Sequence, residues 1–396
     1  MKLLFANIRI GNRNIPFPVL LWFLLAIFAA VAEISRGAGD INNFLIFRNV
    51  FWHTFNRENL YLPYPELYFD TNHYGPVFSV LIAPFALMPI AIGCFLWCML
   101  NAWILYYAIS KLPLTRQQQL GILLITAVEM MTSIHNVQFN PMLAGWIILS
   151  YVLTQKKQYL WATFFIAAGM YVKLYGIIGL AFFWFCDNKP RFVLYFIGWV
   201  IVLFCLPMLI SSPEFIIQSY KDWYQSLVEK NASNVDLTAG SGMQDISLAG
   251  MIRRIFGLKH MPGLPILIPA AILYLLPFLR ISQFREIGFR LSYLALALIG
   301  VVIFSSSAES PTYVIAVAGA AIWYVIQDDL TFKPWVFILI LLFILTIFSP
   351  TDIVPRYIRE HFVVKYSLKA LPCFIVWCVL IVQLLKKDFR IRTKAL

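Results

Sequence analysis

Ionisable side chains are concentrated in one stretch of this sequence, residues 35–91. The whole chain is 13% charged and 61% hydrophobic, so a stretch this polar between two apolar runs is unusual. A carboxylate with an ordinary pKa of about 4 is ionised at neutral pH and can accept a proton. We therefore expect proton-transfer chemistry here. The ionisable residues of the stretch are Arg36, Asp40, Arg48, His53, Arg57, Glu58, Glu66, Asp70 and His73.

Asp40 is the first acid after the first apolar run. Gly37, Ala38 and Gly39 precede it, and residues this small allow close approach of the backbone. One interpretation is that Asp40 is a general base, which must reach the proton of a reacting hydroxyl. The other is that it caps the N-terminus of a helix over residues 41–51. The residue types alone leave both open.

The composition is typical of an integral membrane protein. The mean hydropathy is +0.78, and the chain contains 12 Trp, 19 Tyr and 34 Phe. Apolar runs of about 20 residues recur, as transmembrane helices require. The run from Pro18 to Glu33 lacks a small-residue cleavage site, so we interpret it as a first membrane anchor and not as a signal peptide.

These runs predict an all-α integral membrane fold. It would be a multi-pass bundle of about twelve transmembrane helices, with further helices at the outer surface, in a single domain covering residues 1–396. Residues 76–90 are apolar but contain Pro76, Pro84 and Pro89, so we interpret them as an interfacial or partly inserted helix. The predicted spans are 18–34, 92–110, 119–134, 139–154, 159–172, 174–187, 191–210, 264–280, 288–305, 311–327, 333–349 and 367–386.

The connections between these spans alternate between two kinds. Short basic connections, such as 111–119, 155–158 and 280–290, belong in the cytoplasm by the positive-inside rule. This explains the net charge of +12 without nucleic-acid binding. Both termini would then be cytoplasmic. The other connections would lie outside, in the periplasm or exterior of a bacterial inner membrane: 35–91 as a first large loop, 134–140, 211–262 as a second large loop, 305–311 and 350–366.

Two of the outer turns carry polar groups beside apolar runs. Lys173 lies between two short runs, either as a lysine whose ammonium reaches the interface or as a cation aimed at an anionic substrate. Gln138 and Asn140 lie in a turn between two predicted spans, and Pro141 is a natural first residue for the helix that follows. They are either solvated turn residues or amides that bind sugar hydroxyls, since each amide offers donors and an acceptor.

The second large loop contains two adjacent arginines. Residues 213–230 look like an amphipathic helix, and 232–242 look like a polar connection. Asp245 and Ser247 can cap a short helix that ends near Arg253 and Arg254. Because guanidinium groups bind phosphate well, these arginines are candidates for a phosphate site. The alternative is attraction to lipid headgroups.

Two acids near apolar runs also need partners. Glu309 is followed by a proline-started run, so it is either an ordinary helix cap or a residue lining a cavity. Glu129 falls inside a predicted span. An ionisable group there is costly unless it is paired, and we interpret it as a structural ion pair.

Several classes of chemistry lack their signatures. The sequence has no Walker loop, kinase signature, GxSxG or HExxH motif, which argues against ATP-driven transport and against those hydrolases. The six cysteines all lie in or beside apolar runs and fit buried packing. Asp70 and His73 form the only close pair of metal-ligand types, which is too few for a metal site. We therefore expect no metal and no cofactor.

The sequence resembles the GT-C superfamily of integral-membrane glycosyltransferases that use polyprenyl-phosphate sugars. Within it, the chain is most similar to glycosyltransferase family 87, the bacterial α-mannosyltransferase family that includes the mycobacterial phosphatidylinositol-mannoside polymerase. The resemblance covers roughly residues 36–310. Val137 stands where a Gly is common, and Glu309 to Tyr313 replace a Trp and His of many relatives. The motifs that carry it are Gly39-Asp40-Ile41 to Phe44 with Asn59-Leu60-Tyr61, His73-Tyr74-Gly75-Pro76, Gln138-x-Asn140 with Lys173, and Gln244-Asp245-Ile246-Ser247-Leu248 with Arg254.

The resemblance implies a GT-C-like bundle that catalyses an inverting transfer. A sugar, mannose or another hexose or pentose, would move from a polyprenyl-phosphate donor to a lipid or glycan acceptor on the outer face. Asp40 would be the general base. The substrate-binding candidates are Lys173, Arg253, Arg254, Gln138, Asn140, His73, Tyr74 and Glu309.

Two other classes of function stay open. A flippase or transporter would bind the same lipid phosphate without chemistry, but it needs polar access from both faces, whereas the polar groups here gather on one. A membrane scaffold would leave the outward arginine pair unexplained.

Overall fold

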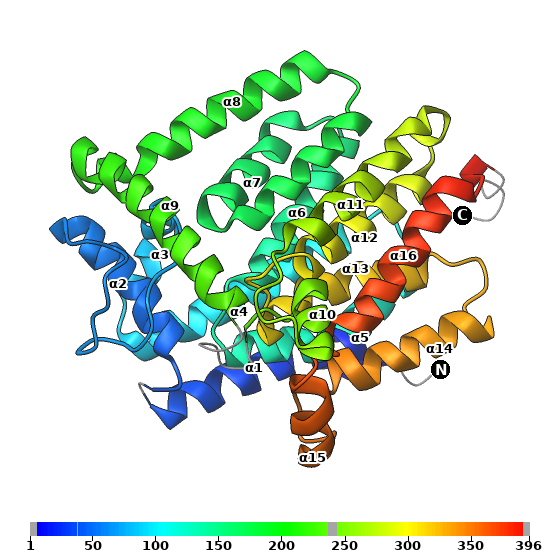
Figure 1. Ribbon diagram of the computed structural model, residues 1–396, viewed down its shortest axis with the longest axis horizontal. Helices are drawn as coiled ribbons and strands as arrows, with labels where there is room; N and C mark the ends of the chain where they lie inside the picture. Colours follow the sequence, from blue (N-terminus) through cyan, green and yellow to red (C-terminus); the bar gives the residue numbers. More distant parts are fainter. Residues whose placement is uncertain (1–5, 38, 237–243, 391–396) are drawn as a thin grey trace. The chain divides into compact units, whose positions relative to one another are not determined.

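The computed structural model describes residues 6–37, 39–236 and 244–390 of the chain, and nearly all of its regular structure is helical (Figure 1). The chain forms two compact units, whose boundaries run through α1, α5 and α9. The first consists of residues 20–112 and 130–230. The second consists of residues 1–19, 113–129 and 231–396.

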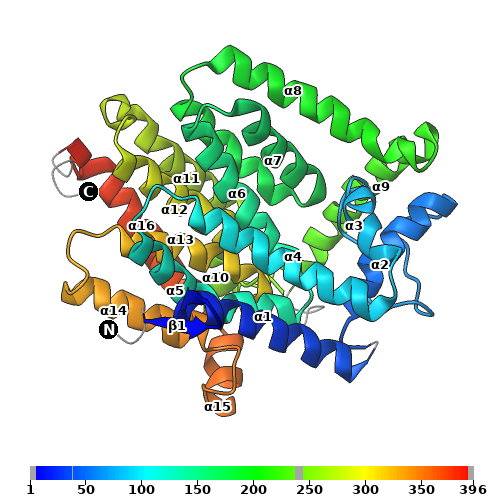
Figure 2. The same ribbon diagram turned by 180° about the vertical axis from the view of Figure 1, so that it is seen from behind.

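The unit of residues 20–112 and 130–230 is built from long helices joined by shorter helical segments. Helices α4, α6, α7 and α8 pack in sequence, and α2 and α3 lie side by side near the start of α4 (Figures 1 and 2). Its elements are α1 (Phe17–Arg36), α2 (Asn42–Asn56), α3 (Phe78–Ala86), α4 (Ile90–Ser110), α6 (Asn140–Gln155), α7 (Tyr159–Val172), η2 (Leu174–Phe185), α8 (Lys189–Cys205), η3 (Leu206–Leu209) and most of α9 (Pro213–Val235).

The other unit centres on α12, α13 and α16, which pack on one another, with the short helix α10 against α16 (Figure 1). An N-terminal hairpin pairs Asn7 with Pro16 and Ile10 with Arg13; its turn places Gly11 at a φ of +57°. The elements are β1 (Asn7–Ile10), β2 (Arg13–Pro16), most of α5 (Arg116–His135), α10 (Leu248–Phe256), α11 (Leu264–Leu275), η4 (Leu276–Leu279), η5 (Ile281–Gln283), α12 (Ile287–Ile303), η6 (Ser310–Thr312), α13 (Tyr313–Val325), α14 (Lys333–Leu341), η7 (Leu342–Ile347), α15 (Arg356–Ile358), η8 (Arg359–Val364) and α16 (Ala370–Lys386).

Every predicted span falls on a helix of the structure, including the 3₁₀ and π segments. The predicted all-α fold is therefore confirmed, and its apolar helices are consistent with a membrane protein. Among the described residues, three helical stretches are long and apolar enough to cross a membrane: Phe17–Arg36, Ile90–Ser110 and Lys189–Leu209. Other apolar helices are shorter. The number of crossings, about twelve, stays a prediction, as does the orientation.

The two ambiguous apolar segments are short helices. Helix α3 has 9 residues with Pro84 inside it. At ~1.5 Å per residue it extends over about 14 Å, less than half of a ~30 Å hydrocarbon core. The chain over 159–187 is divided at Lys173 into α7 and η2, as the two-helix interpretation predicted.

The second large loop begins with the predicted amphipathic helix, now α9. It continues to Val235, so the predicted connection at 232–242 is helical in its first residues. The rest of that connection, from 237, lies outside the described residues. Helix α10 then begins at the predicted cap: Ser247 Oγ accepts a hydrogen bond from the backbone N–H of Gly250 at 3.0 Å.

Candidate active site

Asp40 lies on an exposed turn between α1 and α2. Its backbone N–H donates to the carbonyl of Gly37 at 3.3 Å. The N-cap of α2 is Ile41, and no side chain caps this helix. Asp40 therefore does not act as the helix cap that one interpretation predicted. Within the described part of the chain its carboxylate makes no hydrogen bond or ion pair, so it is open to a ligand.

A buried acid fixes one side of this turn, and a side-chain amide fixes the other. Glu33, near the end of α1, is 5% exposed. Its Oε1 lies 2.5 Å from His135 Nδ1 and 2.9 Å from Arg36 Nη1. On the other side, Asn43 Nδ2 donates to the carbonyl of Asn136 at 2.8 Å. The Asp40 turn is thus held against the 135–136 end of α5.

The Glu33–His135 contact was not predicted from the sequence. The sequence does indicate that Glu33 needs a partner, because it is the one acid in the apolar run of α1 and an ionisable group there is costly unless it is paired. The partner is 102 positions away in the sequence, and nothing local to Glu33 indicates it.

Four predicted binding residues come together beside the same turn of the chain. Tyr74 Oη donates to Gln138 Oε1 at 3.3 Å. Lys173 Nζ donates to Asn140 Oδ1 at 2.9 Å and lies 5.1 Å from the centre of the Tyr175 ring. The Asn140 side chain is fully buried, and its Nδ2 has no hydrogen-bond partner among the described residues. The half-buried ammonium of Lys173 thus lies beside the Asn140 amide, and the Tyr74 phenol contacts the Gln138 amide of the same turn.

Gly75 allows residues 73–76 to pack closely against the end of α7. Its N–H donates to the carbonyl of Val172 at 3.2 Å, next to Lys173. A Cβ added at Gly75 would lie 2.0 Å from the carbonyl oxygen of Tyr171. Any residue with a side chain would therefore push residues 73–76 away from the end of α7.

The turn before Gln138 is strained. Val137 has a φ of +50°, and a β-branched residue is rarely found in this left-handed region. The residue is buried, and its carbonyl accepts a hydrogen bond from Trp97 Nε1 at 3.4 Å. Packing therefore holds Val137 in a conformation that glycine adopts easily.

His73 lies in a polar setting formed with α9. Its Nδ1 lies 3.0 Å from Ser226 Oγ, and its carbonyl accepts from Trp223 Nε1 at 2.9 Å. Burial, followed by the charges of Lys230 and Lys173, lowers the pKa of His73 to about 4, although Asp70 acts in the opposite direction. His73 is therefore neutral at neutral pH and can serve as a hydrogen-bonding group but not as a cation.

This lowered pKa predicts a loss of stability in acid. Between about pH 6.5 and pH 4 the unfolded chain takes up a proton at His73 and the folded chain does not, so stability falls as the pH falls. We expect the free energy of unfolding to fall by up to about 2 kcal/mol over this range, allowing for solvent screening. Thermal unfolding of the detergent-solubilised protein at several pH values measures it. His73→Gln keeps a hydrogen-bonding group and should flatten this part of the profile; an unchanged profile would mean that other groups cause it.

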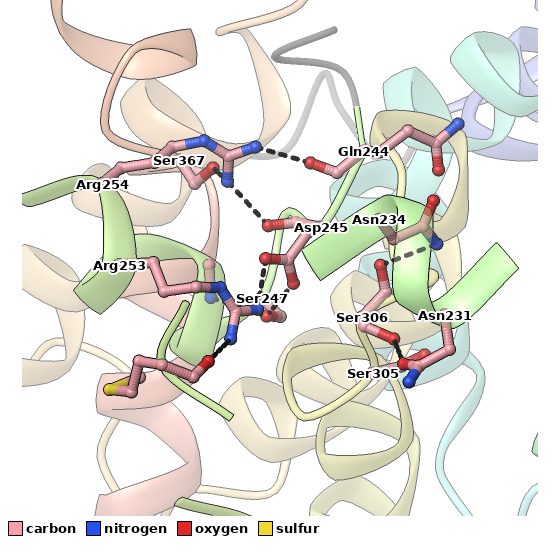
Figure 3. Close-up of polar contacts among 12 residues, drawn as sticks. Asn231, Asn234, Gln244, Asp245, Ser247, Arg253, Arg254, Ser305, Ser306 and Ser367 are labelled. Atoms are coloured by element: carbon pink, nitrogen blue, oxygen red, sulfur yellow. Dashed lines mark hydrogen bonds and ion pairs between the residues drawn. The ribbon is translucent and has the colours of Figure 1, made fainter. Parts of the chain in front are cut away.

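The predicted arginines belong to a second, separate cluster around the 244–248 segment (Figure 3). Arg253 and Asp245 are fully buried, and Arg253 Nη2 lies 2.5 Å from Asp245 Oδ2. Arg253 Nη1 donates to the carbonyl of Met261 at 2.8 Å. Burial raises the pKa of Asp245, while hydrogen bonds from Arg253 and Ser247 oppose this shift. Arg253 thus serves mainly to hold the segment together.

Arg254 is engaged in the same way. It donates to the carbonyls of Gln244 and Asp245, each at 2.8 Å, and to Ser367 Oγ at 2.5 Å. Glu309 accepts a hydrogen bond from Gln244 Nε2 at 2.9 Å. The backbone N–H of Glu309 also donates to Thr312 Oγ1 at 3.3 Å. Glu309 is therefore both the N-cap of η6 and a contact of the 244–248 segment.

Glu129 has the structural partner that its position required. Its Oε1 lies 2.7 Å from Lys369 Nζ, and both side chains are buried. Lys369 also donates to Ser310 Oγ at 2.9 Å, next to Glu309. This confirms that Glu129 forms a structural ion pair. The described residues contain no group of three or more His, Cys, Asp or Glu side chains that could hold a metal ion; the expected independence from metals stays a prediction.

Comparison with known families identifies the chain. Residues 72–311 match the sequence model of glycosyltransferase family 87, well over half of the 396 residues. No curated protein matches the chain. The matched region includes both clusters of predicted binding residues, from His73 to Glu309, but begins after Asp40. The chain therefore belongs to glycosyltransferase family 87, and it is a membrane-associated glycosyltransferase.

Proposed function

We propose that this glycosyltransferase moves a sugar from a polyprenyl-phosphate donor to a lipid or glycan acceptor, with Asp40 as the general base. The observation that carries the proposal is the exposed Asp40 carboxylate on a turn fixed by Glu33, His135 and Asn43. A base is effective only when it is accessible and held in place. The sugar is mannose or another hexose or pentose.

The reaction needs one proton acceptor and stabilisation of one leaving group. The acceptor hydroxyl gives its proton to the Asp40 carboxylate as its oxygen forms a bond to the anomeric carbon of the sugar. The bond from that carbon to the phosphate oxygen breaks, and the phosphate leaves with the electron pair. Attack from the face opposite the leaving group inverts the anomeric configuration. The phosphate is a stable anion, so it needs a cation more than an acid.

Lys173 is the cation that we assign to the donor phosphate. Its ammonium is half-buried beside Asn140, Gln138 and Tyr74, and a partly desolvated charge attracts an anion more strongly than one in bulk water. Gln138, Tyr74 and the neutral His73 supply the hydrogen-bonding groups for sugar hydroxyls.

Arg253 and Arg254 have a different role in this proposal from the phosphate binding expected from sequence. Their guanidinium groups are already engaged by Asp245, Ser367 and backbone carbonyls. We assign them the task of fixing the segment 244–248, including the Gln244 side chain that donates to Glu309. Gln244 and Glu309 then form a polar surface suited to sugar hydroxyls.

We further propose a location and a set of partners for the protein. The protein resides in a bacterial inner membrane with both termini in the cytoplasm, and its active site faces the periplasm or exterior. Its partners are the polyprenyl-phosphate sugar, the acceptor and membrane lipid; no metal or other cofactor takes part. A flippase for the same lipid is the alternative, and it would leave the sugar on its carrier.

The test is an assay for transfer by the purified protein. It is incubated with radiolabelled polyprenyl-phosphate mannose, other polyprenyl-phosphate sugars and nucleotide sugars in parallel, each with a lipid extract. A labelled product from a polyprenyl-phosphate sugar, and none from a nucleotide sugar, is expected. Labelling from nucleotide sugars alone would contradict the proposed donor class.

Replacing Lys173 should weaken donor binding. Lys173→Gln keeps a hydrogen bond to Asn140 but removes the charge. Loss of one charge-assisted contact costs about 1.5–3 kcal/mol, or about tenfold or more in affinity. The dissociation constant of polyprenyl phosphate measures this directly. Lys156→Gln, at an exposed lysine on another turn, is the control. Equal affinities in both variants would remove Lys173 from the donor site.

A further inference from the structure

Lys369 is a buried cation at the start of α16 that the proposed transfer does not yet use. It is the N-cap residue of that helix, and its side chain is 4% exposed. Its Nζ lies 2.7 Å from Glu129 Oε1 and donates to Ser310 Oγ at 2.9 Å. It also lies 5.2 Å from the centre of the Tyr313 ring. Within one compact unit, this ammonium thus joins α5 to the turn at which η6 and α13 begin.

Fold stability alone does not explain an ion pair at this position. Burying two charges is costly, and replacing a buried ion pair by well-packed apolar residues is often neutral or stabilising. The Oε2 atom of Glu129 has no hydrogen-bond partner among the described residues, which adds to the cost of burial. What an ammonium supplies and an apolar side chain does not is a set of three N–H donors. The pair therefore places the group that those donors hold, the Ser310 hydroxyl.

Ser310 directly follows Glu309, the acid assigned above to sugar hydroxyls. The Glu309 carboxylate is held by Gln244, whose Nε2 donates to Oε1 at 2.9 Å. The backbone next to Glu309 is held by Lys369 through Ser310 Oγ. Because a hydrogen bond weakens steeply as its angle departs from the preferred range, a small shift of this turn is enough to weaken contacts between Glu309 and a sugar.

The 244–248 segment is attached to the same turn by bonds that do not involve the Ser310 side chain. The backbone N–H of Ile246 donates to the carbonyl of Ala308 at 2.8 Å. Tyr313 Oη donates to the carbonyl of Ile246 at 2.7 Å. Among the described residues, Lys369 is the one hydrogen-bond partner of the Ser310 hydroxyl. Removing that hydroxyl therefore breaks the contact with Lys369 and leaves the other attachments in place.

We propose that Lys369 is a positioning residue for sugar recognition. Its ammonium, held by Glu129, fixes Ser310 and thereby sets the direction in which the Glu309 carboxylate meets the sugar of the donor. The inference rests on the proposed function, because it takes Glu309 to contact that sugar. Lys369 itself touches neither the sugar nor the phosphate.

Ser310→Ala tests the contact without disturbing the buried ion pair. The ligands are the polyprenyl-phosphate sugar that the wild-type protein transfers and polyprenyl phosphate without a sugar. We expect the dissociation constant of the first to rise about tenfold, the effect of losing one charge-assisted hydrogen bond, and that of the second to change less than about twofold. Ser292→Ala is the control, since Ser292 Oγ of α12 donates to the carbonyl of Gly288 at 2.8 Å. It should match wild type for both ligands.

Neutral variants of the ion pair separate positioning from stability. Lys369→Met leaves the buried Glu129 carboxylate unpaired and should unfold more easily than wild type. Lys369→Met combined with Glu129→Leu removes both charges and should recover most of the lost stability. Affinity for the sugar-bearing donor should stay about tenfold below wild type in this double variant, because the bond to Ser310 is still absent. Thermal unfolding and the two dissociation constants measure both effects.

Three results would overturn the inference. One is recovery of affinity together with stability in the double variant, which would give Lys369 a structural role only. The others are unchanged affinity in Ser310→Ala and an equal loss of affinity for polyprenyl phosphate without a sugar. All three leave the proposed transfer standing as long as the wild-type protein forms glycosylated product. A wild type that forms none contradicts the proposed function itself, and this inference with it.

Discussion

Asp40→Asn is expected to lower the turnover number for sugar transfer by about 10²–10⁴-fold while donor affinity stays close to that of wild type. Asn keeps the shape of the side chain and removes only the basic oxygen. Asp40 is exposed and does not cap α2, so the substitution should leave folding stability unchanged. Single-turnover kinetics with a polyprenyl-phosphate sugar, together with a donor-binding measurement, separate the two effects.

Asp70→Asn is the matched control for this experiment. Asp70 lies in the same loop as Asp40, between α1 and α4, where its Oδ1 accepts a hydrogen bond from the N–H of Thr71 at 2.8 Å. Its φ is +81°, which Asn also tolerates. We expect near-normal turnover for Asp70→Asn. If a folded Asp40→Asn protein turns over normally instead, Asp40 is not the base.

Arg253→Met should destabilise the fold by about 3–5 kcal/mol, because it leaves the buried Asp245 carboxylate without its partner. The 2.5 Å contact between two fully buried groups is the reason for so large an effect. The double variant Asp245→Asn with Arg253→Met removes both charges and should be less destabilised than the sum of the single variants. Chemical or thermal unfolding of all four proteins gives the coupling free energy.

Arg254→Met is the comparison for this cycle. Arg254 is only half-buried, and most of its hydrogen bonds go to backbone carbonyls, so we expect a smaller loss of stability. If Arg253→Met unfolds no more easily than Arg254→Met, while donor affinity falls sharply, then Arg253 binds the lipid phosphate directly, as the sequence first suggested.

Much of the fold could be predicted because a bilayer imposes a simple rule. A segment that crosses it must satisfy its own backbone hydrogen bonds and must be apolar, and both properties are local. The predicted spans therefore fall on helices, including the two short ones that Lys173 separates, and the proline-containing segment 76–90, which we did not count as a span, contains the short helix α3. The N-terminal hairpin at Asn7–Pro16 was not predicted, because short polar strands carry little periodic signal.

The site was harder to predict because its contacts join distant parts of the chain. The sequence marked Glu129 as needing a partner but could not indicate Lys369, which is 240 positions away. It marked Arg253 and Arg254 as unusual cations, yet their burial and the Asp245 carboxylate decide their role. Val137 was visible as a departure from a glycine position, and its φ of +50° gives the physical reason for that glycine.

The central claim is that the protein transfers a sugar and does not merely bind its lipid carrier. The most direct measurement follows a labelled polyprenyl-phosphate sugar in proteoliposomes containing wild-type protein and an acceptor lipid extract. We predict that glycosylated acceptor and free polyprenyl phosphate form in a one-to-one ratio, with the anomeric configuration of the sugar inverted. A sugar that crosses the bilayer while it stays attached to polyprenyl phosphate would contradict the account.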